Sequence, residues 1–128
     1  MSDYTLVNLH EVDDAAGKFG QEANGAIRPA REALNAEQVG VMVHQLKPGK
    51  RQGFGHRHER AEEIFVVLSG SGRVMINDQL VELRERDAVR IAAAASRRFE
   101  AGPEGLDLLA VGQHFKNDGE FQPDFWAE

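Results

Sequence analysis

The stretch PGKRQGFGHRHERAEEIFVVLSG, residues 48–70, predicts both a fold and a site. His56 and His58 are two residues apart, and alternate side chains of a β-strand share a face, so both imidazoles can point the same way. Glu63 follows and begins the apolar run Ile64–Leu68. Two neutral nitrogens and one carboxylate on a rigid strand pair make a metal site with positions left open for water or a ligand.

The order of these residues resembles the first motif of the cupin superfamily. That motif has a glycine, His-x-His, a glutamate three or four residues further on and, after six more residues, a second glycine. Here four residues separate His58 from Glu63, and Ile64–Ser69 separate Glu63 from Gly70. The resemblance covers about residues 40–112. It implies an all-β fold, the double-stranded β-helix or jelly-roll barrel of cupins, with a divalent metal ion on His56, His58 and Glu63.

The composition limits the classes of function. With 128 residues the chain is long enough to build one domain with its own core, and we expect a single cupin domain. The chain has no cysteine, so any metal must be held by nitrogen and oxygen ligands. A formal net charge of −6 argues against nucleic acid or an anionic membrane as a partner. The N-terminal residues have neither a basic lead nor a long apolar run, so we expect a cytoplasmic protein. The resemblance to cupins implies a small-molecule ligand.

Turn residues and short apolar runs divide the chain. We expect an N-terminal cover segment over residues 1–35, a conserved barrel over residues 36–115 and a C-terminal tail over residues 116–128. Alternating or apolar runs between turn residues predict strands. These runs are Tyr4–Leu9, where the alternation is weak, Val39–Leu46, Ile64–Leu68, Arg73–Ile76, Leu80–Leu83, Val89–Ile91 and Leu106–Val111. Because Ile64–Leu68 does not alternate, we expect both of its faces to be covered, one by the barrel and the other by the second subunit of a homodimer.

The second cupin motif differs here at one position. In the family, a Gly-Asp turn leads through a strand and a loop to a third histidine, the fourth metal ligand. Aligned on Arg86–Asp87, that histidine falls on Arg97, and Phe99 matches the aromatic residue that follows two positions later. An arginine stays protonated and has no lone pair to give, so Arg97 cannot replace the ligand.

Three interpretations of Arg97 are open at this point. In the first, the metal stays on the other three ligands, and Arg97 clamps a carboxylate or phosphate of an anionic ligand. In the second, Arg97 occupies the metal position and pairs with Glu63, which leaves a metal-free pocket. In the third, Arg97 points outward and another histidine completes the site. His44 is the best candidate because it shares a strand face with Leu46, which points into the barrel in cupin-like chains, and His114 is the next.

Two functional hypotheses follow, with a weaker third. The first is a metal-dependent enzyme of the oxygenase or isomerase type that acts on a small anionic molecule, with Arg97, Phe99 and His114 as substrate contacts. Its ligands suit Fe, Mn, Ni, Co or Zn and do not choose among them. The second is a non-catalytic binding or sensor cupin, metal-free if Arg97 pairs with Glu63. The third is a structural or storage protein that has kept the fold and lost the site.

Overall fold

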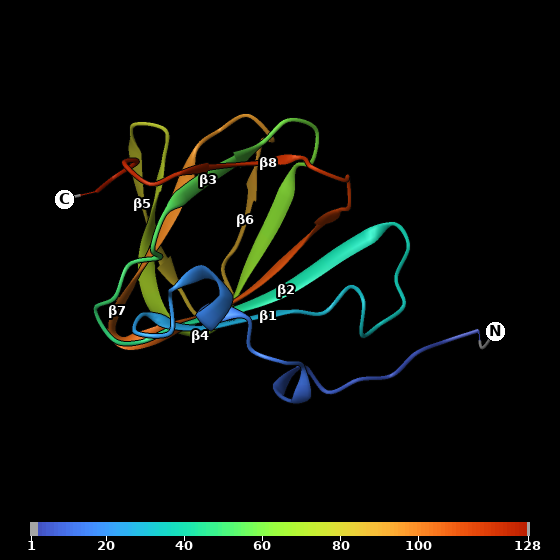
Figure 1. The fold of residues 1–128 in the computed structure, drawn as a ribbon. Helices are drawn as coiled ribbons and strands as arrows, with labels where there is room; N and C mark the ends of the chain where they lie inside the picture. Colours follow the sequence, from blue (N-terminus) through green and yellow to red (C-terminus); the bar gives the residue numbers. More distant parts are fainter. Residues whose placement is uncertain (1–2, 128) are drawn as a thin grey trace.

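The computed structural model describes residues 3–127, and within them the chain forms strands and two short 3-10 helices (Figure 1). The helices are η1 (Leu9–Glu11) and η2 (Ala16–Phe19). The strands are β1 (Gly25–Pro29), β2 (Val39–Leu46), β3 (Gly55–His58), β4 (Glu63–Ile76), β5 (Gln79–Arg84), β6 (Ala88–Ile91), β7 (Arg97–Gln113) and β8 (Gly119–Gln122). The predicted all-β fold is confirmed.

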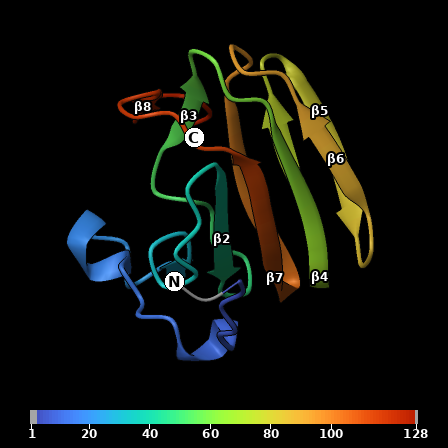
Figure 2. The same cartoon turned by 90° about the vertical axis from the view of Figure 1, so that its right-hand side faces the viewer.

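The long strand β7 joins the two walls of the barrel. One stretch of β7 pairs antiparallel with β2, and β4 pairs with β7 along most of its length. At its start β7 pairs with β3 through Arg97 and His56, and β8 lies on the other edge of β3. Figure 2 shows β7, β4, β5 and β6 on one side and β3 and β8 on the other. The sheet thus curls into the jelly-roll barrel that the sequence predicts.

The inner face of the sheet forms the hydrophobic core. Phe65 and Phe99 are both fully buried, and their ring centroids lie 4.6 Å apart, within the range of favourable aromatic pairs. The outer face of β4 is different. Ile64 is 45% and Leu68 46% exposed, so within one chain only the inner face of this strand is covered.

Two local features differ from the sequence expectations. Residues 64–68 and 73–76 belong to one continuous strand, β4, because the register shifts near Gly70 absorb a bend without ending the strand. Gly70 has a φ of 81°, a conformation that favours glycine. Tyr4–Leu9 is not a strand; the chain there leads into η1, which is capped by the side chain of Asn8.

Strands at both ends of the chain complete the sheet. β1 lies within the expected cover segment and pairs with β2, and β8 lies within the expected tail. Residues 1, 2 and 128 of these two segments lie outside the described part of the chain. Across residues 3–127, no helix is long and apolar enough to cross a membrane.

Two arginines hold the chain that follows β8. Arg51 donates a hydrogen bond to the carbonyl oxygen of Trp126 at 2.6 Å, and its guanidinium lies 3.7 Å from the centroid of the indole ring. Arg98 donates to the carbonyl oxygen of Phe125 at 2.9 Å. The tail is therefore fixed against the barrel beyond the strand pairing of β8 with β3.

Candidate metal site

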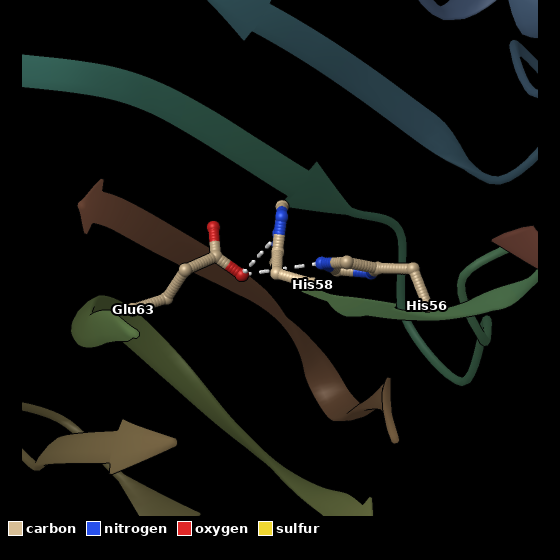
Figure 3. Close-up of side chains that lie close together, drawn as sticks. All are labelled: His56, His58 and Glu63. Carbon is tan, nitrogen blue, oxygen red and sulfur yellow. Dashed lines mark hydrogen bonds and ion pairs between the residues drawn. The ribbon is translucent and has the colours of Figure 1, made fainter. Parts of the chain in front are cut away.

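Strand β3 and the start of β4 bring three metal-ligating side chains together (Figure 3). The Nε2 atoms of His56 and His58 lie 3.2 Å and 3.1 Å from the same oxygen, Oε1 of Glu63. One possible ligand atom from each residue lies within 4.8 Å of the other two. The alternation of β3 places both imidazoles on one face, and the short turn after β3 returns the chain so that Glu63 meets them.

The charges of Glu63 and His56 suit metal binding. Burial raises the pKa of the Glu63 carboxyl, but the close approach of His56 and His58 outweighs it and holds that pKa far below its usual range. Burial lowers the pKa of His56, and this effect outweighs the opposing attraction to Glu63. An ionised carboxylate and a neutral imidazole are the forms that bind a metal ion.

Asp118, at the start of the tail, contacts the other side of one imidazole. Its Oδ2 atom lies 3.3 Å from Nδ1 of His58. The carboxylate is itself buried and accepts hydrogen bonds from the backbone nitrogens of Arg60 and Ala61, at 2.9 Å and 3.0 Å. Burial raises the pKa of Asp118, but these backbone hydrogen bonds outweigh it, so the group stays ionised. Asp118 thus directs Nδ1 of His58 toward itself and leaves Nε2 for the site.

Arg97 lies inside the barrel wall. Its side chain is fully buried and donates a hydrogen bond to the carbonyl oxygen of Ala92 at 3.1 Å. Arg97 does not line the cavity that adjoins His56, His58 and Glu63. Arg97 therefore does not point outward, and its guanidinium has no exposed surface in this conformation. Its role as a clamp for an anionic ligand stays a prediction. Nη2 of Arg97 is 4.0 Å from Oε1 of Glu63, farther than either imidazole.

His44 lies in the cavity but outside the group of three ligands. Its Nδ1 is 3.5 Å from Nε2 of Gln52, whose Oε1 accepts a hydrogen bond from the backbone nitrogen of Phe99. The amide nitrogen of Gln52 therefore faces His44, and Nδ1 must be the acceptor. Burial, followed by the charge of His56, lowers the pKa of His44 to about 4, so the ring is neutral and carries its proton on Nε2. In this tautomer His44 offers a hydrogen-bond donor, with no lone pair on Nε2 for a metal.

The other two predicted contacts lie elsewhere. Phe99 is fully buried against Phe65 in the core and is not among the residues that line the cavity. A substrate contact by Phe99 stays a prediction. His114 is exposed at the end of β7, where its backbone nitrogen donates to the carbonyl oxygen of Gln38 at 2.7 Å. It lines a hollow of about 260 Å³ that also reaches His58.

A cavity of about 200 Å³ opens on the face of the three ligands where His44 lies. It and the hollow near His114 share His58 and Glu63, so space adjoins the group on two sides. Sequence reasoning missed Asp118 because a single acidic residue in a polar tail carries no spacing signal. It also missed Phe19, Phe54 and Phe121, which line the cavity from segments far apart in the sequence.

Known families and structures agree with this architecture. A family model described as a cupin domain matches residues 42–112, more than half of the chain, and the chain therefore belongs to the cupin family. The predicted family is confirmed. A search of curated proteins found no match.

Solved structures share the fold at low sequence identity. A cupin protein from Bacteroides fragilis is 22% identical, with a TM-score of 0.73, over 91% of this chain and 89% of its own. A sugar phosphate isomerase of the cupin superfamily from Silicibacter pomeroyi is 16% identical, with a TM-score of 0.74, over 91% and 81%. A variant of oxalate decarboxylase from B. subtilis is 21% identical, with a TM-score of 0.75, over 100% of this chain and 35% of its own. These similarities show the fold alone.

Proposed function

We propose that this cupin binds a divalent metal ion through His56, His58 and Glu63 and acts as a metal-dependent enzyme on a small molecule. The observation that carries the proposal is the convergence of both Nε2 atoms on one Glu63 oxygen, at 3.2 Å and 3.1 Å, beside a cavity. Both ring nitrogens of His58 are buried and make no hydrogen bond within the described residues, although carboxylates lie near. The donor set and this imidazole fit a metal ion.

The residues around the ligands have separate roles in this proposal. Fe, Mn, Ni, Co or Zn at the three ligands would supply a Lewis acid, or a centre for oxygen chemistry, with positions open to a substrate. Glu63 supplies the negative charge that holds the cation. Asp118 orients His58, and His44 donates a hydrogen bond to an oxygen of the substrate. Isomerase, lyase, dioxygenase and decarboxylase are among the names of proteins with this fold, so the fold supports several reactions.

A metal-free binding cupin is the second candidate, and Arg97 favours it. A buried guanidinium 4.0 Å from the Glu63 carboxylate repels a second cation at the same place. Opposite charges at this separation attract by about 4 kcal/mol at the effective dielectric constant of a protein surface. In this candidate, Glu63 is neutralised by Arg97 and the barrel serves as a sensor or carrier.

Elemental analysis distinguishes the two candidates. Protein purified without a nickel column is compared with the double variant His56→Ala, His58→Ala and with the control His114→Ala, which removes an exposed histidine outside the group. We expect about one equivalent of metal in the wild type and the control, and its loss in the double variant. Wild-type protein that is metal-free and also fails to take up added Fe, Mn, Ni, Co or Zn contradicts the metal centre and favours the Arg97–Glu63 pair.

The remaining expectations of assembly and location are also proposals. The exposed Ile64 and Leu68 on the outer face of β4 support a homodimer, because homodimer interfaces are more apolar than the rest of a protein surface. A cytoplasmic location stays a prediction.

A further inference from the structure

The cavity beside the proposed metal centre has an aromatic wall. Phe19 comes from η2, Phe54 precedes β3 and Phe121 lies on β8. The ring centroid of Phe54 is 4.6 Å from that of Phe121, and both are 6.3 Å from that of Phe19. These separations lie in the range in which aromatic rings attract one another. Phe19 is 44% and Phe121 60% exposed, so much of this aromatic surface is open to a ligand.

No cationic side chain lines this cavity. Among the residues of the described chain that surround it, none is lysine or arginine, and the one acidic residue is Glu63. Phosphates and dicarboxylates are bound in proteins by arginine and lysine, which neutralise and hold several oxygens. Arg97 has no exposed surface and stays outside the lining. The cavity therefore disfavours a ligand with several negative charges.

The cavity also has polar groups in its wall, including the amide side chains of Gln21, Asn24 and Gln52. His44 lies in the wall together with His56, His58 and Glu63, and its neutral ring offers an N–H donor. One oxygen function of a ligand can thus meet a donor, and a metal ion if one is bound. The cavity has a volume of about 200 Å³. An engineered apolar cavity that binds benzene is somewhat smaller, with a volume of about 150 Å³. The cavity of this cupin accommodates one ring with a small substituent.

We propose that the cavity selects a single-ring aromatic molecule with one oxygen function, of the phenol or monocarboxylate class, whose ring packs against Phe19, Phe54 and Phe121. The contact between the site and the oxygen of the ligand depends on the proposed metal-binding function. The packing of the ligand ring against the three phenylalanines does not depend on a metal. Sugar phosphates and dicarboxylates are excluded as preferred ligands.

The test measures binding by calorimetry to protein loaded with Co²⁺, whose visible spectrum reports metal occupancy separately. The probes are benzoate, acetate, oxalate and glucose 6-phosphate. We expect benzoate to bind at least about tenfold more tightly than acetate, because only benzoate has a ring. Phe121→Ala removes most of this ratio without affecting Co²⁺ uptake. The control Leu80→Ala, which removes a comparably exposed apolar side chain on β5 outside the cavity lining, preserves it.

Several results would overturn the inference. Equal binding of benzoate and acetate by the wild type contradicts it, as does tighter binding of oxalate or glucose 6-phosphate than of benzoate. An unchanged ratio in Phe121→Ala contradicts the role of the aromatic wall. Failure to take up Co²⁺ counts against the proposed metal function by itself, and metal-free protein is then titrated with phenol. Saturable binding of phenol that Phe121→Ala weakens supports the aromatic cavity, and no binding overturns it.

Discussion

Replacing His44 by glutamine tests whether the cavity keeps this imidazole neutral. Burial inside the barrel, together with the charge of His56, lowers the pKa of His44 from 6.5 to about 4. In the unfolded chain the same side chain titrates near its ordinary pKa of about 6.5. Between these two values the unfolded state binds more protons than the folded state, so the free energy of unfolding falls as the pH is lowered through this window.

The size of the effect follows from the two pKa values. At pH 7 both states leave His44 almost entirely neutral, whereas at pH 5 the unfolded state is protonated and the folded state is not. The free energy of unfolding therefore loses about 2 kcal/mol from His44 alone between pH 7 and pH 5. His56 has a pKa shift of the same sign and adds to the loss in both proteins. The lowered pKa of Glu63 decreases the free energy of unfolding only as the pH falls below about 4.5. That range lies below the two pH values compared.

Urea denaturation of metal-free protein at pH 7 and pH 5 measures this difference. We expect the wild type to lose about 2 kcal/mol more than His44→Gln over this range. The control His10→Gln removes an exposed histidine and should behave as the wild type does. If the wild type and His44→Gln lose equal stability, the folded protein does not hold His44 neutral, and the tautomer assigned from Gln52 loses its basis.

Three further predictions concern other parts of the molecule. Asp118→Asn should weaken metal binding about 10–100-fold in competition with a chelator, because His58 loses the carboxylate that orients it; unchanged affinity would refute the orienting role. Gly70→Ala should reduce the free energy of unfolding by at least about 2 kcal/mol, because φ is positive there and a Cβ would overlap a backbone carbonyl of β7; a thermal melt like that of the wild type would contradict this. Sedimentation velocity at micromolar concentration should find a dimer that Ile64→Lys dissociates, with Leu68→Lys as a second variant, and a monomeric wild type would refute the homodimer.

The group of proposed metal ligands could be predicted because the signal is local. His56, His58 and Glu63 lie within eight residues of sequence, and strand alternation with one short turn is enough to bring them together. Arg97 could be aligned by motif, but its burial depends on the packing of β7 against β3 and β4. A one-dimensional pattern does not contain that packing.

The positions of Asp118 and of the aromatic side chains around the site depend on pairing between segments that lie far apart in the sequence. The antiparallel register of β3 with β8 sets Phe121 opposite His56 and Gly119 opposite His58, and this places Asp118 beside the imidazole. No spacing rule connects residues more than fifty positions apart in a single sequence. The same limit explains why the sequence analysis assigned β8 to a tail outside the barrel.

Because β8 pairs with β3, the proposed metal ligands and part of the aromatic wall come from two separate stretches of the chain. The proposed ligands come from residues 56–63, whereas one residue of the aromatic wall comes from a four-residue strand near the C-terminus. Substitutions at Phe121 and its neighbours, with Asp118 kept, can therefore change which ligand the cavity binds without altering the proposed metal ligands. Exchanging this strand between cupins in which β8 and β3 pair in the same register offers a way to change the ligand preference while the proposed metal ligands are kept.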